Sequence, residues 1–266
     1  MSIQNIKKGM IQLSLKGLHA LLIGTAGSGK STLTASFGKW LEENIDLKVA
    51  YINLDPGCIL TPFKPDFDVR EFFTVDQIMK TEMLGPNGAM IRAAELMEER
   101  FKEIVGRISM IEADIKLIDT PGQMEIFVFR PSGPRIAEAL CKKGPTLAIY
   151  IIDPYFAETA TGLAIATSLS IATQLRLDVP TITIINKADK LGEKDIESYF
   201  TDPECLRKAI IEEKSGALTD LTLQYVDAMI NFAKFSNIVK LSAKTSMGLD
   251  RLYDLCHEVF CACGEL

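Results

Sequence analysis

A glycine-rich segment near the N-terminus has the residue types and spacing of a phosphate-binding loop. Its glycines allow the backbone to curl, so that amide hydrogens converge on phosphate oxygens, and a helix beginning here adds the positive end of its dipole. Lys30 is then expected to reach the β- and γ-phosphates, and the Ser31 hydroxyl to bind Mg²⁺. The alternative is an ordinary glycine turn. The predicted cradle consists of Gly24, Thr25, Ala26, Gly27, Ser28, Gly29, Lys30, Ser31 and Thr32.

Two later segments predict which base accompanies these phosphates. "NKAD" at 186–189 ends an apolar stretch, and the Asp189 carboxylate can accept two hydrogen bonds, from N1 and the 2-amino group of guanine. Adenine lacks this pair of donors and would leave the carboxylate unpaired. Asn186 and Lys187 are expected to brace the pocket. A second base-contacting loop is expected at "SAK", which comprises Ser242, Ala243 and Lys244. The sequence therefore predicts GTP and GDP as ligands.

The segment "DTPGQ" at 119–123 carries residues suited to hydrolysis. Asp119 is predicted to hold Mg²⁺ through a water, and Gly122 to offer its backbone N–H to the γ-phosphate. Gln123 is a candidate for orienting the attacking water, as in other GTPases. Glu125 could position the same water; the alternative is a solvated carboxylate at the start of a helix.

Asp55, at the end of "YINLD", is a further candidate. A helix at about 30–44 joins two apolar stretches with too little chain for an additional switch loop. Such a crossover gives a parallel neighbouring strand and places Asp55 beside the phosphates. Asp55 would then either help to hold magnesium indirectly, through another ligand, or act as a base toward the attacking water. The alternative is an aspartate that caps the turn before Pro56.

These residues follow short runs rich in Val, Ile and Leu, which alternate with segments of helical period. Runs that are apolar nearly throughout are typical of strands covered on both faces, and a repeated strand–helix order indicates parallel pairing. The predicted fold is α/β, a mostly parallel P-loop NTPase sheet flanked by helices, with helical insertions. The expected strands are 18–24, 49–55, 115–120, 146–153, 181–186 and 238–243.

The chain is predicted to form one domain, 17–266, after an N-terminal extension at 1–16. Helical insertions are expected at about 69–108 and 190–236, and a C-terminal helix at about 247–261. In the first insertion, "LGPNGAM" at 84–90 is expected to be a turn, followed by a helix at 90–108. Apolar residues at helical spacing are Ala93, Met97, Phe101, Ile104 and Ile108 in the first insertion, Leu218, Leu221, Tyr225, Met229 and Phe232 in the second, and Leu249, Leu252, Cys256 and Phe260 near the C-terminus.

Composition excludes several other functions. The 266 residues carry a net charge of −6 with no long basic run, so direct nucleic-acid binding is not expected. No apolar run approaches a membrane span, and the N-terminus lacks the core of an export signal. The six cysteines are therefore expected to be reduced, in a cytoplasmic protein. A metal site at Cys256, His257, Cys261 and Cys263 is the alternative, without the spacing of structural zinc sites.

Taken together, the motifs strongly resemble the GPN-loop GTPases, and the resemblance covers nearly all of the chain. Besides the segments above it includes "DVREF" and "GPNGA". Thr25 stands where the related ATPases carry a signature lysine. The resemblance implies a homodimer in which Gly85, Pro86 and Asn87 of one subunit reach the partner's nucleotide, so that Asn87 acts in trans. An archaeal-type member is indicated, because the long acidic tails of eukaryotic members are missing.

The family association with RNA polymerase assembly implies a protein client, and a GTP-driven conformational switch as the leading function. One alternative is a nucleotide-gated chaperone or scaffold with negligible turnover. A metal-insertion GTPase is another, motivated by the C-terminal cysteines. A P-loop small-molecule kinase is disfavoured, because "NKAD" and "DTPGQ" have no use in one.

Overall fold

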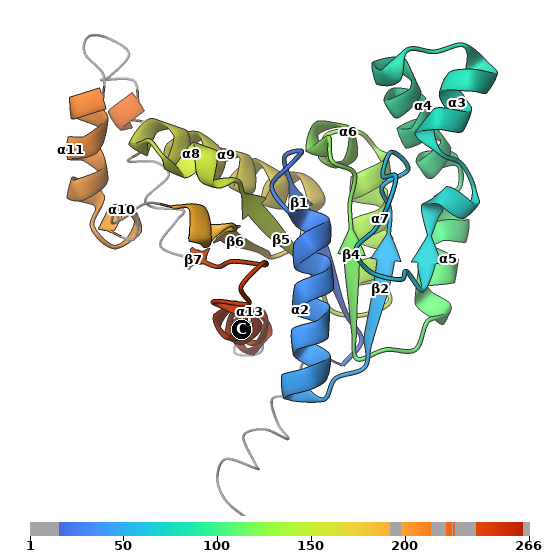
Figure 1. Ribbon diagram of the computed structural model, residues 1–266, viewed down its shortest axis with the longest axis horizontal. Helices are drawn as coiled ribbons and strands as arrows, with labels where there is room; N and C mark the ends of the chain where they lie inside the picture. Colours follow the sequence, from blue (N-terminus) through green and yellow to red (C-terminus); the bar gives the residue numbers. More distant parts are fainter. Residues whose placement is uncertain (1–15, 192–197, 214–221, 225, 227–237, 263–266) are drawn as a thin grey trace, which may run out of the picture.

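The computed structural model describes residues 16–191, 198–213, 222–224, 226 and 238–262 (Figure 1). Strands and helices alternate along most of this part. The strands are β1 (Leu18–Gly24), β2 (Val49–Asn53), β3 (Phe67–Asp68), β4 (Ile115–Asp119), β5 (Thr146–Ile152), β6 (Thr181–Ile185) and β7 (Val239–Lys240). The helices are α2 (Lys30–Ile45), α3 (Val75–Glu82), α4 (Pro86–Glu99), α5 (Phe101–Met110), α6 (Met124–Val128), α7 (Ser132–Cys141), α8 (Pro154–Ala157), α9 (Ala160–Leu177), α10 (Ser198–Thr201), α11 (Pro203–Glu213) and α13 (Leu249–Ala262), with short 3-10 turns at Val69–Glu71 and Ala188–Lys190.

The strands form one sheet of order β3-β2-β4-β1-β5-β6-β7, in which every pair is parallel. This confirms the predicted sheet and the parallel direction of β2. The direct neighbour of β2 is β4, which lies between β2 and β1, and Asn53 pairs with Asp119. The carboxyl ends of β1, β2 and β4 therefore meet at one edge, where their following loops are brought together.

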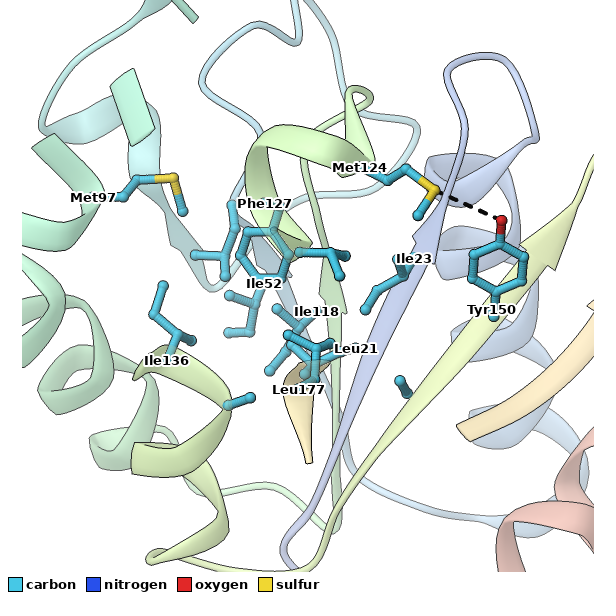
Figure 2. Close-up of a cluster of buried hydrophobic side chains, with 14 of the residues drawn as sticks. Leu21, Ile23, Ile52, Met97, Ile118, Met124, Phe127, Ile136, Tyr150 and Leu177 are labelled. Atoms are coloured by element: carbon cyan, nitrogen blue, oxygen red, sulfur yellow. Dashed lines mark hydrogen bonds between the residues drawn. The ribbon is translucent and has the colours of Figure 1, made fainter. Parts of the chain in front are cut away.

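Each face of the sheet is covered by helices, as the apolar strands predicted. Along β1, Leu18, Ala20 and Leu22 belong to a core shared with α2 and α13. Leu21 and Ile23 point to the opposite core, which includes buried residues of α4, α5, α6, α7 and α9 (Figure 2). Alternate side chains of one strand thus anchor two helical layers.

Helix α6, which follows Gln123 directly, is anchored in the second of these cores. Met124 and Phe127 are each 1% exposed, and the Tyr150 hydroxyl contacts Met124 Sδ at 3.7 Å (Figure 2). Because these side chains are held from the core side, the exposed Gln123 and Glu125 lie on a fixed support.

The first insertion differs from its prediction. The expected turn at 84–90 is mostly helix, because Gly85 caps α4 and Pro86 occupies the first turn. Proline is suited to that position, since its φ is preset for a helix and its missing N–H would be unpaired there anyway. The reversal instead occurs at Met83, whose φ is 54°. The expected single helix at 90–108 is two, α4 and α5, which meet at Arg100.

Other differences lie at the edges of the fold. The last predicted strand is reduced to the two residues of β7, and the short edge strand β3 was not expected. The five apolar residues named for the second insertion, between Leu218 and Phe232, lie outside the described residues. None of the described helices combines the length and apolar composition that a membrane span requires.

Buried His19 predicts an acid-sensitive fold. It lies on β1 at 1% exposure, and burial, with the nearby Lys116 charge, lowers its pKa from 6.5 to about 4. The unfolded chain therefore binds a proton more readily, so that stability is lost as pH falls from about 6.5 through about 4. A shift of this size corresponds to about 3 kcal/mol. In urea titrations, the free energy of unfolding of His19→Leu is expected to fall less between pH 7 and pH 4 than that of the unmodified chain. An equal fall in the two proteins would show that His19 is not the source of the acid sensitivity.

Candidate nucleotide site

The segment between β1 and α2 folds as a tight loop that requires its glycines. Gly27 and Gly29 have φ of 81° and 94°, in the region that residues with a side chain rarely adopt. A Cβ on Gly29 would collide with the Asn186 amide. Gly29 is also the N-cap of α2, so the loop backbone leads directly into the positive end of that helix.

Lys30 lies inside this loop as a buried ammonium. Its Nζ donates to the Gly24 and Thr25 carbonyl oxygens at 2.9 and 3.0 Å. Burial lowers its pKa, while the carboxylates of Asp119, Asp55 and Glu125 act in the opposite direction. The loop carbonyls thus hold the lysine at the centre of the site, among acidic groups.

Asp119, the last residue of β4, offers a ligand set that fits a divalent cation. It is 1% exposed. Neither of its carboxylate oxygens accepts a well-formed hydrogen bond from the described residues. Burial raises its pKa to about 6, the Ser31 hydroxyl and Lys30 oppose that rise, and Asp55 adds to it. Unpaired buried oxygens next to a hydroxyl are suited to Mg²⁺, which prefers oxygen ligands.

Asp55 joins the two loops that follow β2 and β4. Its Oδ2 accepts from the Gly122 N–H at 3.1 Å, and its Oδ1 from the Gly57 N–H at 2.8 Å. Burial raises the pKa of Asp55, and these two amides with Lys30 and Arg70 counteract the rise. Gly122, predicted to donate to a γ-phosphate, thus donates to Asp55 in this structure. The alternative role of Asp55, capping its own turn, is also present through Gly57.

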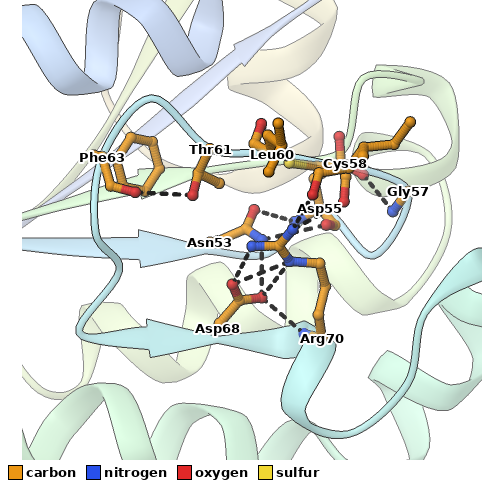
Figure 3. A network of polar contacts seen from close by, with 10 residues as sticks. Asn53, Asp55, Gly57, Cys58, Leu60, Thr61, Phe63, Asp68 and Arg70 are labelled. Carbon is orange, nitrogen blue, oxygen red and sulfur yellow. Dashed lines mark hydrogen bonds and ion pairs between the residues drawn. The ribbon is translucent and has the colours of Figure 1, made fainter.

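A polar network that the sequence did not predict supports the loop after Asp55 (Figure 3). Arg70 pairs with Asp68 at 2.6 Å and donates to the Cys58 and Ile59 carbonyl oxygens. Asn53 donates to Asp68 at 2.9 Å. The positive charge of Arg70 is therefore paired with the Asp68 carboxylate. The available signal in the sequence was "DVREF", which contains both Asp68 and Arg70.

Arg135 of α7 makes a structural contact with the helices of the first insertion. It pairs with Glu98 of α4 at 2.8 Å, and its guanidinium lies 4.2 Å from the centre of the Phe101 ring. Its charge therefore helps to fasten α7 to α4.

The predicted base loops meet through Asn186. Its Nδ2 donates to the Ser28 carbonyl oxygen at 3.0 Å, and its Oδ1 accepts from the Ala243 N–H at 3.1 Å. One buried amide thereby joins the phosphate loop, the "NKAD" segment and the "SAK" segment, although 158 residues separate Ser28 from Asn186.

Asp189 is exposed and oriented by Ser242. The Ser242 hydroxyl donates to Asp189 Oδ1 at 2.6 Å, and this bond is the main reason that the pKa of Asp189 lies below its usual value. The carboxylate is thus held in its charged, accepting form. Lys244 is exposed beside it and also favours the charged state.

Lys187 adopts a left-handed backbone conformation, with φ of 57°, and its side chain lies across the phosphate loop. Its Nζ donates to the Gly27 carbonyl oxygen at 2.5 Å and pairs with Asp153 at 2.7 Å. Asp153 was not predicted as a site residue; its position at the end of an expected strand was the available signal.

Asn87 lies apart from these contacts within the subunit. It is exposed in the first turn of α4, which packs against α3, α6 and α7 (Figure 1). No hydrogen bond from the described residues involves its side chain.

The all-parallel sheet, the glycine loop at its centre and the oriented Asp189 together define a P-loop protein of the GTPase class. Comparisons with known proteins agree with that class. A family model described as "Conserved hypothetical ATP binding protein" matches residues 22–262. A GPN-loop GTPase of Pyrococcus abyssi is 38% identical over 252 residues, which is 92% of this chain and 98% of that protein. This chain belongs to the GPN-loop GTPase family.

A solved structure shows the same fold. The crystal structure of a GTPase in apo form from Pyrococcus abyssi superimposes with a TM-score of 0.83, at 37% identity, over 92% of this chain and 98% of that one. GPN-loop GTPase 1 of Saccharomyces cerevisiae is 27% identical over 241 residues, 86% of this chain but only 62% of its own length. The family resemblance and the predicted enzyme class are thus confirmed.

Proposed function

We propose that this GPN-loop GTPase hydrolyses GTP to GDP and phosphate as a homodimeric conformational switch. The observation that carries the proposal is the convergence of Lys30, Asp119 and Asp55 at the carboxyl edge of the sheet, with Asn186 linking them to the base loops. Phosphate and base recognition are thereby built into one continuous site.

Guanine is the base that this pocket favours, although the matching family model is described by ATP binding. Asp189 is charged and has one oxygen held by Ser242, which leaves acceptor capacity for the N1 and 2-amino donors of guanine. Adenine would leave that capacity unused, at a cost.

Hydrolysis needs a metal, a positioned water and stabilised charge. Ser31 and Asp119 would hold Mg²⁺, which would draw charge from the phosphates. Lys30 would supply the fixed positive charge, and Gln123, at the start of α6, would orient water. Glu125 and Asp55 remain candidates for assisting that water. A γ-phosphate that takes the Gly122 N–H must displace Asp55 from it, so triphosphate binding would change the contact between the two loops.

The homodimer supplies Asn87 in trans, as the family resemblance implies. Its exposed position on α4, without a partner among the described side chains, leaves its amide available to a second subunit. The amide would donate to the phosphates beside the positive end of the helix.

The cellular role is proposed on the family resemblance alone: a cytoplasmic factor for assembling protein complexes such as RNA polymerase. A chaperone with negligible turnover remains the alternative. Metal insertion remains a second alternative: Cys256 is fully buried with its pKa raised to about 12, whereas Cys263 and the side chain of Cys261 lie outside the described part of the chain.

Gln123→Leu is expected to separate hydrolysis from binding. Turnover should fall by about 100-fold because the attacking water loses its orienting amide, whereas the affinity for a fluorescent GTP analogue should change by less than about threefold, since no predicted binding contact is lost. Single-turnover hydrolysis and equilibrium titration measure the two effects. An equal loss of turnover and of nucleotide affinity would contradict the role of Gln123 in orienting water. Unaltered turnover would point to Glu125 or Asp55 as the residue that positions the water.

A further inference from the structure

The helix that carries Asn87 is connected to the nucleotide loops of its own subunit. The connection begins at Asp55, whose two carboxylate oxygens accept from the Gly122 and Gly57 amides. One carboxylate therefore fixes the loop after β4 to the turn after β2. Displacement of Gly122 from Asp55 would remove the contact between the two loops and leave the turn after β2 held by Arg70 and by Asp55 itself.

Met90 of α4 lies directly against this turn. A Cβ placed on Gly57 would be 3.4 Å from Met90 Sδ, so the thioether sits beside the Gly57 backbone. Pro56 and Pro121, the neighbours of Asp55 and Gly122, meet the same helix around a cavity of about 10 Å³. The cavity lining comprises Pro56, Met90, Ala93, Ala94, Met97, Pro121, Ile126, Phe127 and Ser132. Both loops thus contact α4 at one junction.

The helical spacing relates this junction to Asn87. Residues three apart in a helix lie on one side of it, so Met90 stands one turn behind Asn87. Helix α4 runs for 14 residues and is tied to α3 by the Arg92–Glu82 ion pair at 3.3 Å. Such a helix moves as a rigid unit, so a displacement at Met90 is expected to reposition Asn87.

We propose that Met90 is a positioning residue that couples the Asp55–Gly122 contact in one subunit to the Asn87 which that subunit presents to its partner. The coupling rests on the proposed GTPase dimer and extends it. Because the sensing site and the assisted site belong to different subunits, nucleotide occupancy of one pocket controls hydrolysis in the other. Packed groups that can carry such coupling join the two places within each subunit, through Gly57, Met90 and helix α4.

The test compares substitutions along this face of α4. Met90→Ala removes the thioether contact while retaining a strong helix former, and it should lower kcat by about 10-fold with GTP KM within about twofold, because binding groups are untouched. Met90→Leu, of similar volume, should restore most of the rate. Met97→Ala serves as the matched control. Met97 lines the same cavity two turns further on but is not among the nearest neighbours of Gly57, so this change in a more buried residue should lower the melting temperature at least as much, with a smaller loss of kcat.

The decisive measurement adds Met90→Ala to Asn87→Ala. If Met90 acts only through Asn87, the double variant should turn over at the rate of Asn87→Ala alone. The coupling would be overturned if the kcat losses of the two single variants multiplied in the double variant. It would also be overturned if Met97→Ala lost as much kcat as Met90→Ala. Full turnover in Asn87→Ala would overturn the proposed action of Asn87 on the partner's nucleotide, and the coupling with it. That outcome can be told apart from a failure of the coupling alone, in which Asn87→Ala is impaired but the two kcat losses multiply.

Discussion

Asp189→Asn should convert the chain from a guanosine to a xanthosine triphosphatase. In the proposed site the carboxylate would accept from the two guanine donors, whereas an amide can donate to the 2-carbonyl of xanthine. We expect GTP affinity to fall by about 100-fold or more, because a buried donor–acceptor mismatch is costly, and xanthosine triphosphate to become the preferred substrate. Competition of both nucleotides against a fluorescent analogue measures the change.

Ser242→Ala is the matched control for this substitution. It removes the hydroxyl that holds Asp189 Oδ1 at 2.6 Å but leaves the carboxylate in place. GTP should therefore bind several-fold more weakly, by about 1 kcal/mol, without any gain for xanthosine triphosphate. Unchanged guanosine preference in Asp189→Asn would show that the base binds elsewhere.

Asn87→Ala is expected to abolish most turnover while GTP binding persists. Removing one donor that stabilises developing charge typically costs about 100-fold in kcat. If the partner delivers the amide, as proposed, the specific activity of the unmodified protein should fall as dilution dissociates the dimer. Hydrolysis assays across a range of protein concentrations, alongside sedimentation, measure both effects.

Mixed dimers identify where Asn87 acts. Asn87→Ala has an intact pocket without a donor, and Gln123→Leu binds GTP and retains the donor but has an impaired pocket. After equal mixing and random exchange, half of the dimers are mixed and one of their two sites is complete, so about a quarter of full activity should return. If mixing the two variants restored no activity, or if specific activity did not depend on protein concentration, Asn87 would not act on the partner's site.

Much of the site was predictable because its chemistry is local in the sequence. The phosphate loop needs closely spaced glycines with left-handed backbone, as Gly27 and Gly29 show, and a lysine at fixed spacing. The apolar strands before Asp119 and Asn186 predicted, through parallel pairing, that these residues would share an edge. The family resemblance, rather than residue chemistry, assigned Asn87 its function, since "GPN" by itself predicts a turn.

The contacts between loops were not predictable, because they depend on strand order and side-chain direction. Asp153 meets Lys187 only because β5 and β6 are neighbours. In the same way, Gly122 donates to Asp55 because β4 lies beside β2. Helix α4 begins at Pro86 since Gly85 caps it and its buried alanines pack on the core, which outweighs the turn preference of glycine, proline and asparagine.

The sequence by itself predicted the ligand class, the parallel sheet and candidate groups for binding phosphate and base, because each prediction depends on residues close together in the chain. Only the tertiary structure decided that Asp55 holds Gly122, that Ser242 orients Asp189 and that Met90 lies beside the Gly57 turn. Those contacts join segments far apart in the chain, and their partners are selected by packing across the sheet, which no local pattern encodes.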